Sequence, residues 1–113
     1  MFEATVIGNL AQEPRLGHSM SQDPICSLGL IHNWTKLIKD DHGQSGRMEY
    51  SQWVVVSCWG KELSEKANGF KKGDQVRAKG SVTFPSYTKR DGTPGMGVEI
   101  RAIEIELVLE LPH

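Results

Sequence analysis

The chain has 113 residues, of which 38% are hydrophobic and 24% charged, with a formal net charge of −1. This length predicts a single domain over residues 1–113 with its own core. No apolar run approaches the roughly 20 residues that span a bilayer, and the N-terminus lacks the basic segment of a signal peptide, so we expect a cytoplasmic protein without membrane contact. Two cysteines and four histidines show no metal-ligand spacing, so the sequence supports neither a metal nor a cofactor.

The first part of the chain predicts two strands. Residues 2–10 alternate loosely between apolar and polar side chains and stop before a proline and a glycine. Residues 25–34 form a second alternating run with Gly29 inside it, and an interior glycine in a strand usually marks a bulge or a sharp bend. The polar, glycine-containing residues 35–47 then predict an exposed hairpin loop.

A third strand is predicted over residues 51–61, whose sequence is SQWVVVSCWGK. Successive side chains of a strand point to opposite faces, so two valines and a cysteine share one face while Trp53 and Trp59 share the other. The valine face is a good core face by itself. The tryptophan face is therefore a candidate binding surface.

After this strand the apolar period changes to that of a helix. Leu63, Ala67 and Phe70 fall at i, i+4 and i+7, which predicts a short helix of about two turns. Gly69 suits its C-cap.

The last third of the chain predicts two further strands around a second long hairpin. Residues 75–84 alternate most regularly and place Arg77 and Lys79 on the outer face. Turn-forming residues dominate residues 85–97. The final strand covers residues 98–109, and a slip in its apolar phase predicts a bulge near Ala102.

Five strands with one short helix between the third and fourth follow the element order of the OB-fold, a five-stranded Greek-key barrel. The predicted class is therefore all-β. An SH3-like or other small β-barrel is an alternative, but the single helix after the third strand favours the OB-fold.

No catalytic pattern is present, and we expect a binding module and not an enzyme. The aromatic residues Trp34, Trp53, Trp59 and Tyr87 lie on or beside predicted strands, and Tyr87 has cations nearby. Every nucleic-acid base has a π face, so such a set suits a sequence-tolerant single-strand binder, with about 1–3 kcal/mol for each stacked base. The alternative is that one or two of these tryptophans belong to the core or to a subunit interface.

Charge is segregated along the chain. Residues 61–90 contain eight basic and three acidic residues, whereas residues from Glu99 onward contain one basic and four acidic residues. Basic side chains that follow phosphates make binding salt-dependent. A solvated mixed surface is the alternative for any one cluster.

Three spaced motifs in this order resemble the bacterial single-stranded DNA-binding proteins. VIGNLAQEP resembles the first-strand signature of that family, and SQWVVVSCWGKELSEKA resembles its third-strand and helix signature. FKKGDQVRAKG is similar to its turn into the fourth strand. The resemblance covers nearly the whole chain, from Phe2 to about Val108.

The resemblance implies a homo-oligomer, a tetramer or a dimer, that coats single-stranded DNA without sequence readout in DNA replication, recombination or repair. It implies that the aromatic residues stack on bases and that two lysines contact phosphates, to which we add two cations of the fourth strand. The expected DNA-binding residues are Trp34, Trp53, Trp59, Tyr87, Lys61, Lys72, Arg77 and Lys79.

The chain ends in IEIELVLELPH, without the acidic tail through which family members recruit replication and repair partners. We therefore expect a tail-less variant, with replication or recombination proteins as possible partners. A second hypothesis is a primosomal replication protein-like OB-fold module that acts mainly through protein contacts. A third, an oligosaccharide-binding domain or small barrel enzyme, rests on the fold alone.

Overall fold

The computed structural model describes residues 2–108, which form eight strands and one helix. In chain order the elements are β1 (Glu3–Leu10), β2 (Arg15–His18), β3 (Pro24–Lys39), β4 (Ser45–Trp59), α1 (Lys61–Asn68), β5 (Gln75–Thr83), β6 (Ser86–Thr88), β7 (Pro94–Met96) and β8 (Val98–Leu107). Residues 109–113, on which the expected tail-less ending rests, lie outside the described residues.

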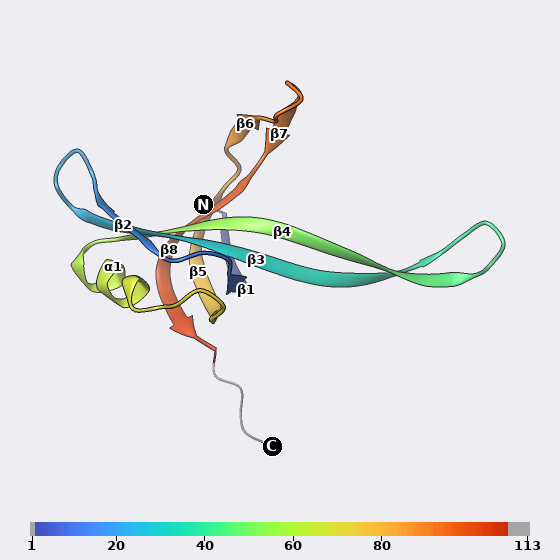
Figure 1. Ribbon diagram of the computed structural model, residues 1–113, viewed down its shortest axis with the longest axis horizontal. Helices are drawn as coiled ribbons and strands as arrows, with labels where there is room; N and C mark the ends of the chain where they lie inside the picture. The colour runs from blue at the N-terminus through green and yellow to red at the C-terminus, as the bar shows by residue number, and fades with distance from the viewer. Residues whose placement is uncertain (1, 109–113) are drawn as a thin grey trace, which may run out of the picture.

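Five of these strands close into a ring, which confirms the predicted barrel of the OB-fold. The order is β1-β5-β8-β4-β3, and β3 pairs with β1 to close it, while β2 adds to the free edge of β3. β4 and β8 are parallel, and the other neighbours in the ring are antiparallel. The helix α1 connects β4 to β5, as expected, and lies against β3, β4 and β8 (Figure 1).

The core lies inside the ring and consists of one alternating face from each strand. Ala67 of α1 is completely buried, and Leu63 and Phe70 pack against the core from the same side, as the helical spacing predicts. The helix ends at Asn68 with Gly69 as its C-cap, as predicted, and the φ of −81° at Gly69 makes this a right-handed cap. The buried apolar residues are Leu10, Cys26, Leu28, Leu30, Val54, Val56, Cys58, Ala67, Val76, Ala78, Ile100, Ala102 and Ile105.

The hairpin between β3 and β4 is much longer than predicted. Its pairing is continuous from Ile25 opposite Trp59 to Lys39 opposite Ser45, so most of residues 35–47, expected to be a loop, belong to strands. The hairpin projects from the barrel as an arm (Figure 1), and the molecule measures 59 Å along its longest axis. The prediction failed because an exposed ladder is held by its backbone hydrogen bonds and needs no alternation of apolar residues.

Three short strands were also absent from the prediction. β2 is four residues long and adds to β3, while β6 and β7 are three residues each and pair with each other inside the second predicted hairpin. Elements this short carry too few residues for a period to be recognised.

Of two predicted irregularities, one is confirmed. Lys79 pairs with Glu104 and the next residue, Gly80, pairs with Ala102, so Ile103 is the extra residue of a bulge in β8. At Gly29, where a bulge or a sharp bend was predicted, the ladder between β3 and β4 has no register shift, so there is no bulge. The reason for this glycine is the tryptophan beside it, described below.

The bulge generates a prediction for Gly80. A Cβ atom at this position would overlap the carbonyl oxygen of Arg101, a backbone atom that cannot move without disturbing the ladder. We expect Gly80→Ala to lower the free energy of unfolding by at least about 1–3 kcal/mol, the usual cost of overpacking. Gly46→Ala is the matched control, since the Cβ atom that it adds would meet nothing within 4 Å. Urea unfolding followed by circular dichroism measures both, and equal stabilities would contradict the geometry.

The two cysteines generate a second prediction. Cys26 and Cys58 are directly opposite in the ladder, both completely buried free thiols. Burial raises the pKa of both, that of Cys58 to about 12, so neither forms the reactive thiolate near neutral pH. We expect a thiol reagent at pH 8 to label the native protein no faster than it unfolds and to label both cysteines at once in urea. Rapid labelling of the native protein would show that this part of the core opens.

Candidate functional site

The outer face of β4 carries the two tryptophans that the sequence singled out. Trp53 is 42% exposed and Trp59 36% exposed, while Val54, Val56 and Cys58 of the same strand lie in the core. Exposed tryptophan on a strand bonded on both sides is unusual, because the indole is a large apolar surface. The predicted orientation of both tryptophans is therefore confirmed.

The ring of Trp53 lies over Gly29 of the neighbouring strand β3. A Cβ atom on this glycine would overlap the indole, with the ring atom Cη2 only 2.8 Å away. The glycine thus leaves room for the ring to lie down on the sheet. Part of the Trp53 ring lies against Gly29, and part of its surface remains open to solvent.

Tyr87 is arranged in the same way on the small hairpin. It is 52% exposed, sits opposite Gly95 in the pair β6–β7, and has its ring carbon Cζ 2.8 Å from where a Cβ atom of that glycine would lie. The hairpin brings Tyr87 to the same cavity as Trp53. This cavity has a volume of about 330 Å³, and its other lining residues include Val55 and Met96.

Trp59 is covered on one side by a residue that the sequence analysis did not select. The guanidinium carbon of Arg101 lies 4.4 Å from the centre of the Trp59 ring, a cation–π contact. The parallel pairing of β4 with β8 places Arg101 beside Ser57, on the tryptophan face. No local pattern reveals this contact, since it depends on strands that are distant in the sequence.

Trp34 belongs to a different surface. Trp34 is opposite Tyr50 in the pairing of β3 with β4. Both residues lie on the face of the hairpin that points into the core nearer the barrel, which is the face opposite to that of Trp53. The rings of Trp34 and Tyr50 are stacked with centroids 5.5 Å apart, and His32 stacks on Trp34 at the same distance. The structure therefore groups Trp53 with Tyr87, and Trp34 with Tyr50.

Two further contacts fix this aromatic stack. The Nδ1 atom of His32 lies 2.9 Å from the carbonyl oxygen of Ile7, to which it donates, and so ties the stack to β1. The hydroxyl of Tyr50 donates to the sulfur of Met48 at 3.1 Å. Tyr50 is not among the predicted site residues because it falls between the predicted loop, residues 35–47, and the predicted third strand, residues 51–61.

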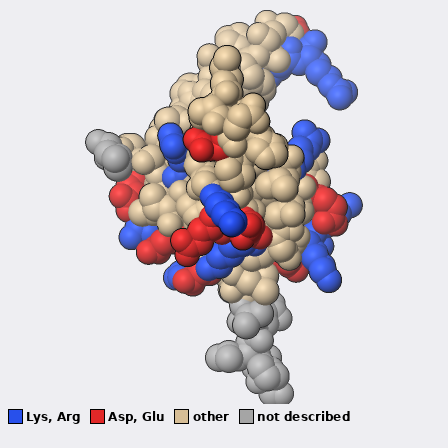
Figure 2. Space-filling view, turned by 90° about the vertical axis from the view of Figure 1, so that its left-hand side faces the viewer, with Lys and Arg blue, Asp and Glu red and all other residues tan. Residues whose placement is uncertain are grey.

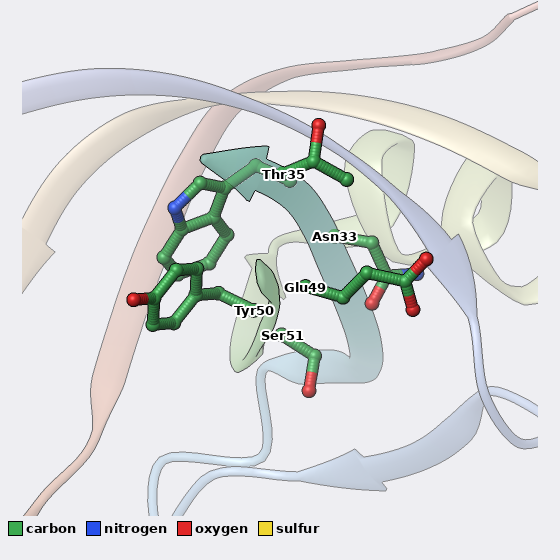
Figure 3. A pocket seen from close by; sticks show the side chains of 6 residues that line it. Asn33, Thr35, Glu49, Tyr50 and Ser51 are labelled. Carbon is green, nitrogen blue, oxygen red and sulfur yellow. The ribbon is translucent and has the colours of Figure 1, made fainter. Parts of the chain in front are cut away.

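A polar cavity of about 650 Å³ lies at the same part of the arm. Figure 3 shows that Tyr50 and Glu49 point to opposite sides of the ladder, with Asn33 and Ser51 on the side of Glu49. The arm thus has an aromatic side and a side of hydrogen-bonding groups.

The predicted basic residues fall into two groups. Lys61 begins α1 directly after Trp59 and Gly60, and Lys72 lies in the turn before β5; both are exposed. Arg77 makes an ion pair with Glu106, and the Nζ atom of Lys79 lies 3.6 Å from a carboxylate oxygen of Glu3. Arg77 and Lys79 therefore each have a carboxylate beside them, whereas Lys61 and Lys72 take part in neither of the ion pairs found in residues 2–108.

The surrounding surface carries both signs of charge. Figure 2 shows basic and acidic side chains intermingled on the end of the molecule that faces the viewer, without one continuous basic surface. Within the described part of the chain, no three His, Cys, Asp or Glu side chains are grouped so that they could hold a metal ion. In the same residues, no helix has the length and apolar character needed to cross a membrane.

Similar proteins agree on one description. A "Single-stranded DNA-binding protein" of Deinococcus radiodurans is 26% identical over 106 residues, covering 94% of this chain and 34% of that protein. One of Xylella fastidiosa is 28% identical over 104 residues, covering 91% of this chain and 60% of that protein. The chain thus spans about one third and about three fifths of the length of these two relatives.

A solved structure supports the fold independently. The small single-stranded DNA-binding protein from Streptomyces coelicolor superposes with a TM-score of 0.71 at 18% identity, over 96% of this chain and 94% of that chain. The family model described as "Single-strand binding protein family" matches residues 1–108. With its closed five-stranded ring, its single helix and this match along nearly its whole length, the chain belongs to the single-strand binding protein family.

Proposed function

We propose that this chain binds single-stranded DNA, with bases stacked on exposed aromatic rings and phosphates neutralised by nearby cations. The observation that carries the proposal is the open aromatic surface of β4, where Trp53 shares an apolar cavity with Tyr87. Base stacking contributes about 1–3 kcal/mol for each base and tolerates any sequence. Membership of the single-strand binding protein family supports the same conclusion.

The proposed site extends over two surfaces. Trp53, Tyr87 and Trp59 lie on the barrel, and Trp34 with Tyr50 lies on the arm, so a strand that contacts both would pass around the base of the arm. Arg101 joins the site, since bases stack on guanidinium planes as well as on aromatic rings. A role as a non-enzymatic coat in replication, recombination or repair follows from this binding mode.

The alternative of a primosome-like module acting mainly through protein contacts is not favoured. The relatives cited above are described as single-stranded DNA-binding proteins. An exposed aromatic surface whose rings lie beside glycines also suits bases better than it suits a structural role in the barrel.

The aromatic surface generates the central prediction. In the variant Trp53→Ala Trp59→Ala we expect the binding free energy for oligo-dT to weaken by about 2–6 kcal/mol, if two stacked bases contribute independently. Fluorescence anisotropy of a labelled oligonucleotide measures binding without relying on the lost tryptophans. Phe2→Ala is the control, because Phe2 is an exposed aromatic residue, 65% accessible, that packs on Phe84. Unchanged affinity of the double variant would refute the site.

The two groups of basic residues generate a second prediction. Each phosphate contact to single-stranded DNA contributes about 0.7 to the slope of log K against log salt. We expect Lys61→Gln and Lys72→Gln each to reduce this slope by about that amount. Arg77→Gln should change it less, because Glu106 already pairs with Arg77. Equal effects of all three substitutions would mean that the ion pair opens when DNA binds.

A further inference from the structure

The cavity between β4 and the β6–β7 hairpin has a polar side that base stacking does not explain. Trp53, Tyr87 and Met96 supply its apolar surface, and the polar residues Gln52 and Glu99 also line it. Glu99 lies opposite Val55 in the parallel pair of β4 and β8, so it belongs to the same outer face as the tryptophans.

Both polar groups offer hydrogen-bond acceptors. The Nε2 atom of Gln52 donates to the carbonyl oxygen of Trp53 at 2.9 Å, and the amide keeps a second N–H donor beside its acceptor oxygen. A carboxylate only accepts hydrogen bonds, and Glu99 takes part in neither ion pair found in residues 2–108. Glu99 is therefore the group of this cavity that can only accept hydrogen bonds, beside the aromatic rings of Trp53 and Tyr87.

A carboxylate in this place works against phosphate binding, so it needs a different explanation. Two residues farther along β8, Arg101 covers Trp59 on the same face. Cation and anion thus occupy neighbouring positions, one at each tryptophan. Such an arrangement suits a surface on which the end with Arg101 contacts a phosphate and the end with Glu99 contacts a base.

The bases differ in what they present to an acceptor. Guanine has adjacent N1–H and N2 amino donors, which match the two oxygens of a carboxylate, whereas thymine has a single N–H between two carbonyl oxygens. A carboxylate also accepts a hydrogen bond from an exocyclic amino group of cytosine. Thymine is therefore the base that the carboxylate of Glu99 accommodates least well.

We propose that the cavity lined by Trp53, Tyr87 and Glu99 is a base-selective subsite that favours guanine over thymine. The inference rests on the proposed binding of single-stranded DNA and adds a local preference to it. The stacking surfaces accept any base, and Glu99 selects among the bases that enter this one position.

The test uses eight-nucleotide thymidine oligonucleotides that carry one central guanosine, one central inosine or no substitution. A single guanine cannot form guanine quartets within the strand, and inosine lacks only the 2-amino group. We expect the wild-type chain to bind the guanosine oligonucleotide roughly tenfold more tightly than the all-thymidine one, as one bidentate contact allows. Inosine should fall between them.

Two variants with the same change of charge isolate the carboxylate. Glu99→Gln should reduce the guanine preference to within about twofold, because an amide cannot accept both donors. Glu104→Gln is the matched control, since Glu104 lies on the same strand but lines the separate cavity that contains Arg77 and Lys79. It should keep the full preference, although the loss of one negative charge raises affinity for every oligonucleotide in both variants.

The outcomes separate the two proposals. Equal wild-type affinities for the guanosine and thymidine oligonucleotides, or a preference that persists in Glu99→Gln, would overturn the subsite. In either case, all-thymidine binding with tryptophan quenching would leave the proposed function intact. If no oligonucleotide binds to the wild-type chain, both the function and the subsite are wrong.

Discussion

Everything proposed for this protein depends on the packing of one strand, β4, between β3 and β8. Val54, Val56 and Cys58 are buried in the core and set the phase of the strand. Because side chains alternate with a period of two, a slip of one residue would put these apolar groups in water and the tryptophans inside. The core therefore determines which face Trp53 and Trp59 present, and binding surface and stability are coupled through the same backbone.

The aromatic rings at the barrel are positioned by the absence of side chains beneath them. Gly29 and Gly95 each leave the space in which a neighbouring ring lies, Trp53 in one case and Tyr87 in the other. A ring held in this way has little freedom to lose when a base stacks on it, which lowers the entropic cost of binding. On the arm, where no core exists, Trp34 is instead oriented by its stacked neighbours.

The cations that the surface offers to DNA depend on which basic side chains are in ion pairs, and not on the net charge of the chain. A formal charge of −1 by itself suggests little attraction for a polyanion. Arg77 and Lys79 are each close to a carboxylate, but Lys61 and Lys72 take part in neither of these two ion pairs found in residues 2–108. Local geometry thus determines which cations are available to phosphates. Glu99 lies on the same face as the tryptophans and its charge repels phosphates, so a favourable contact between this residue and DNA has to involve a base.

The sequence by itself determined the five strands of the barrel, the helix after the third, the bulge in the last strand and the outward orientation of Trp53 and Trp59. These features are local, because hydrophobic periodicity within one segment records which of its faces is buried. Only the tertiary structure decided the length of the arm, the stack of Trp34 on Tyr50, and the positions of Arg101 and Glu99 beside the tryptophans. Those features depend on which strands become neighbours when the ring closes, and pairing between segments far apart in the sequence leaves no periodic signal in either one.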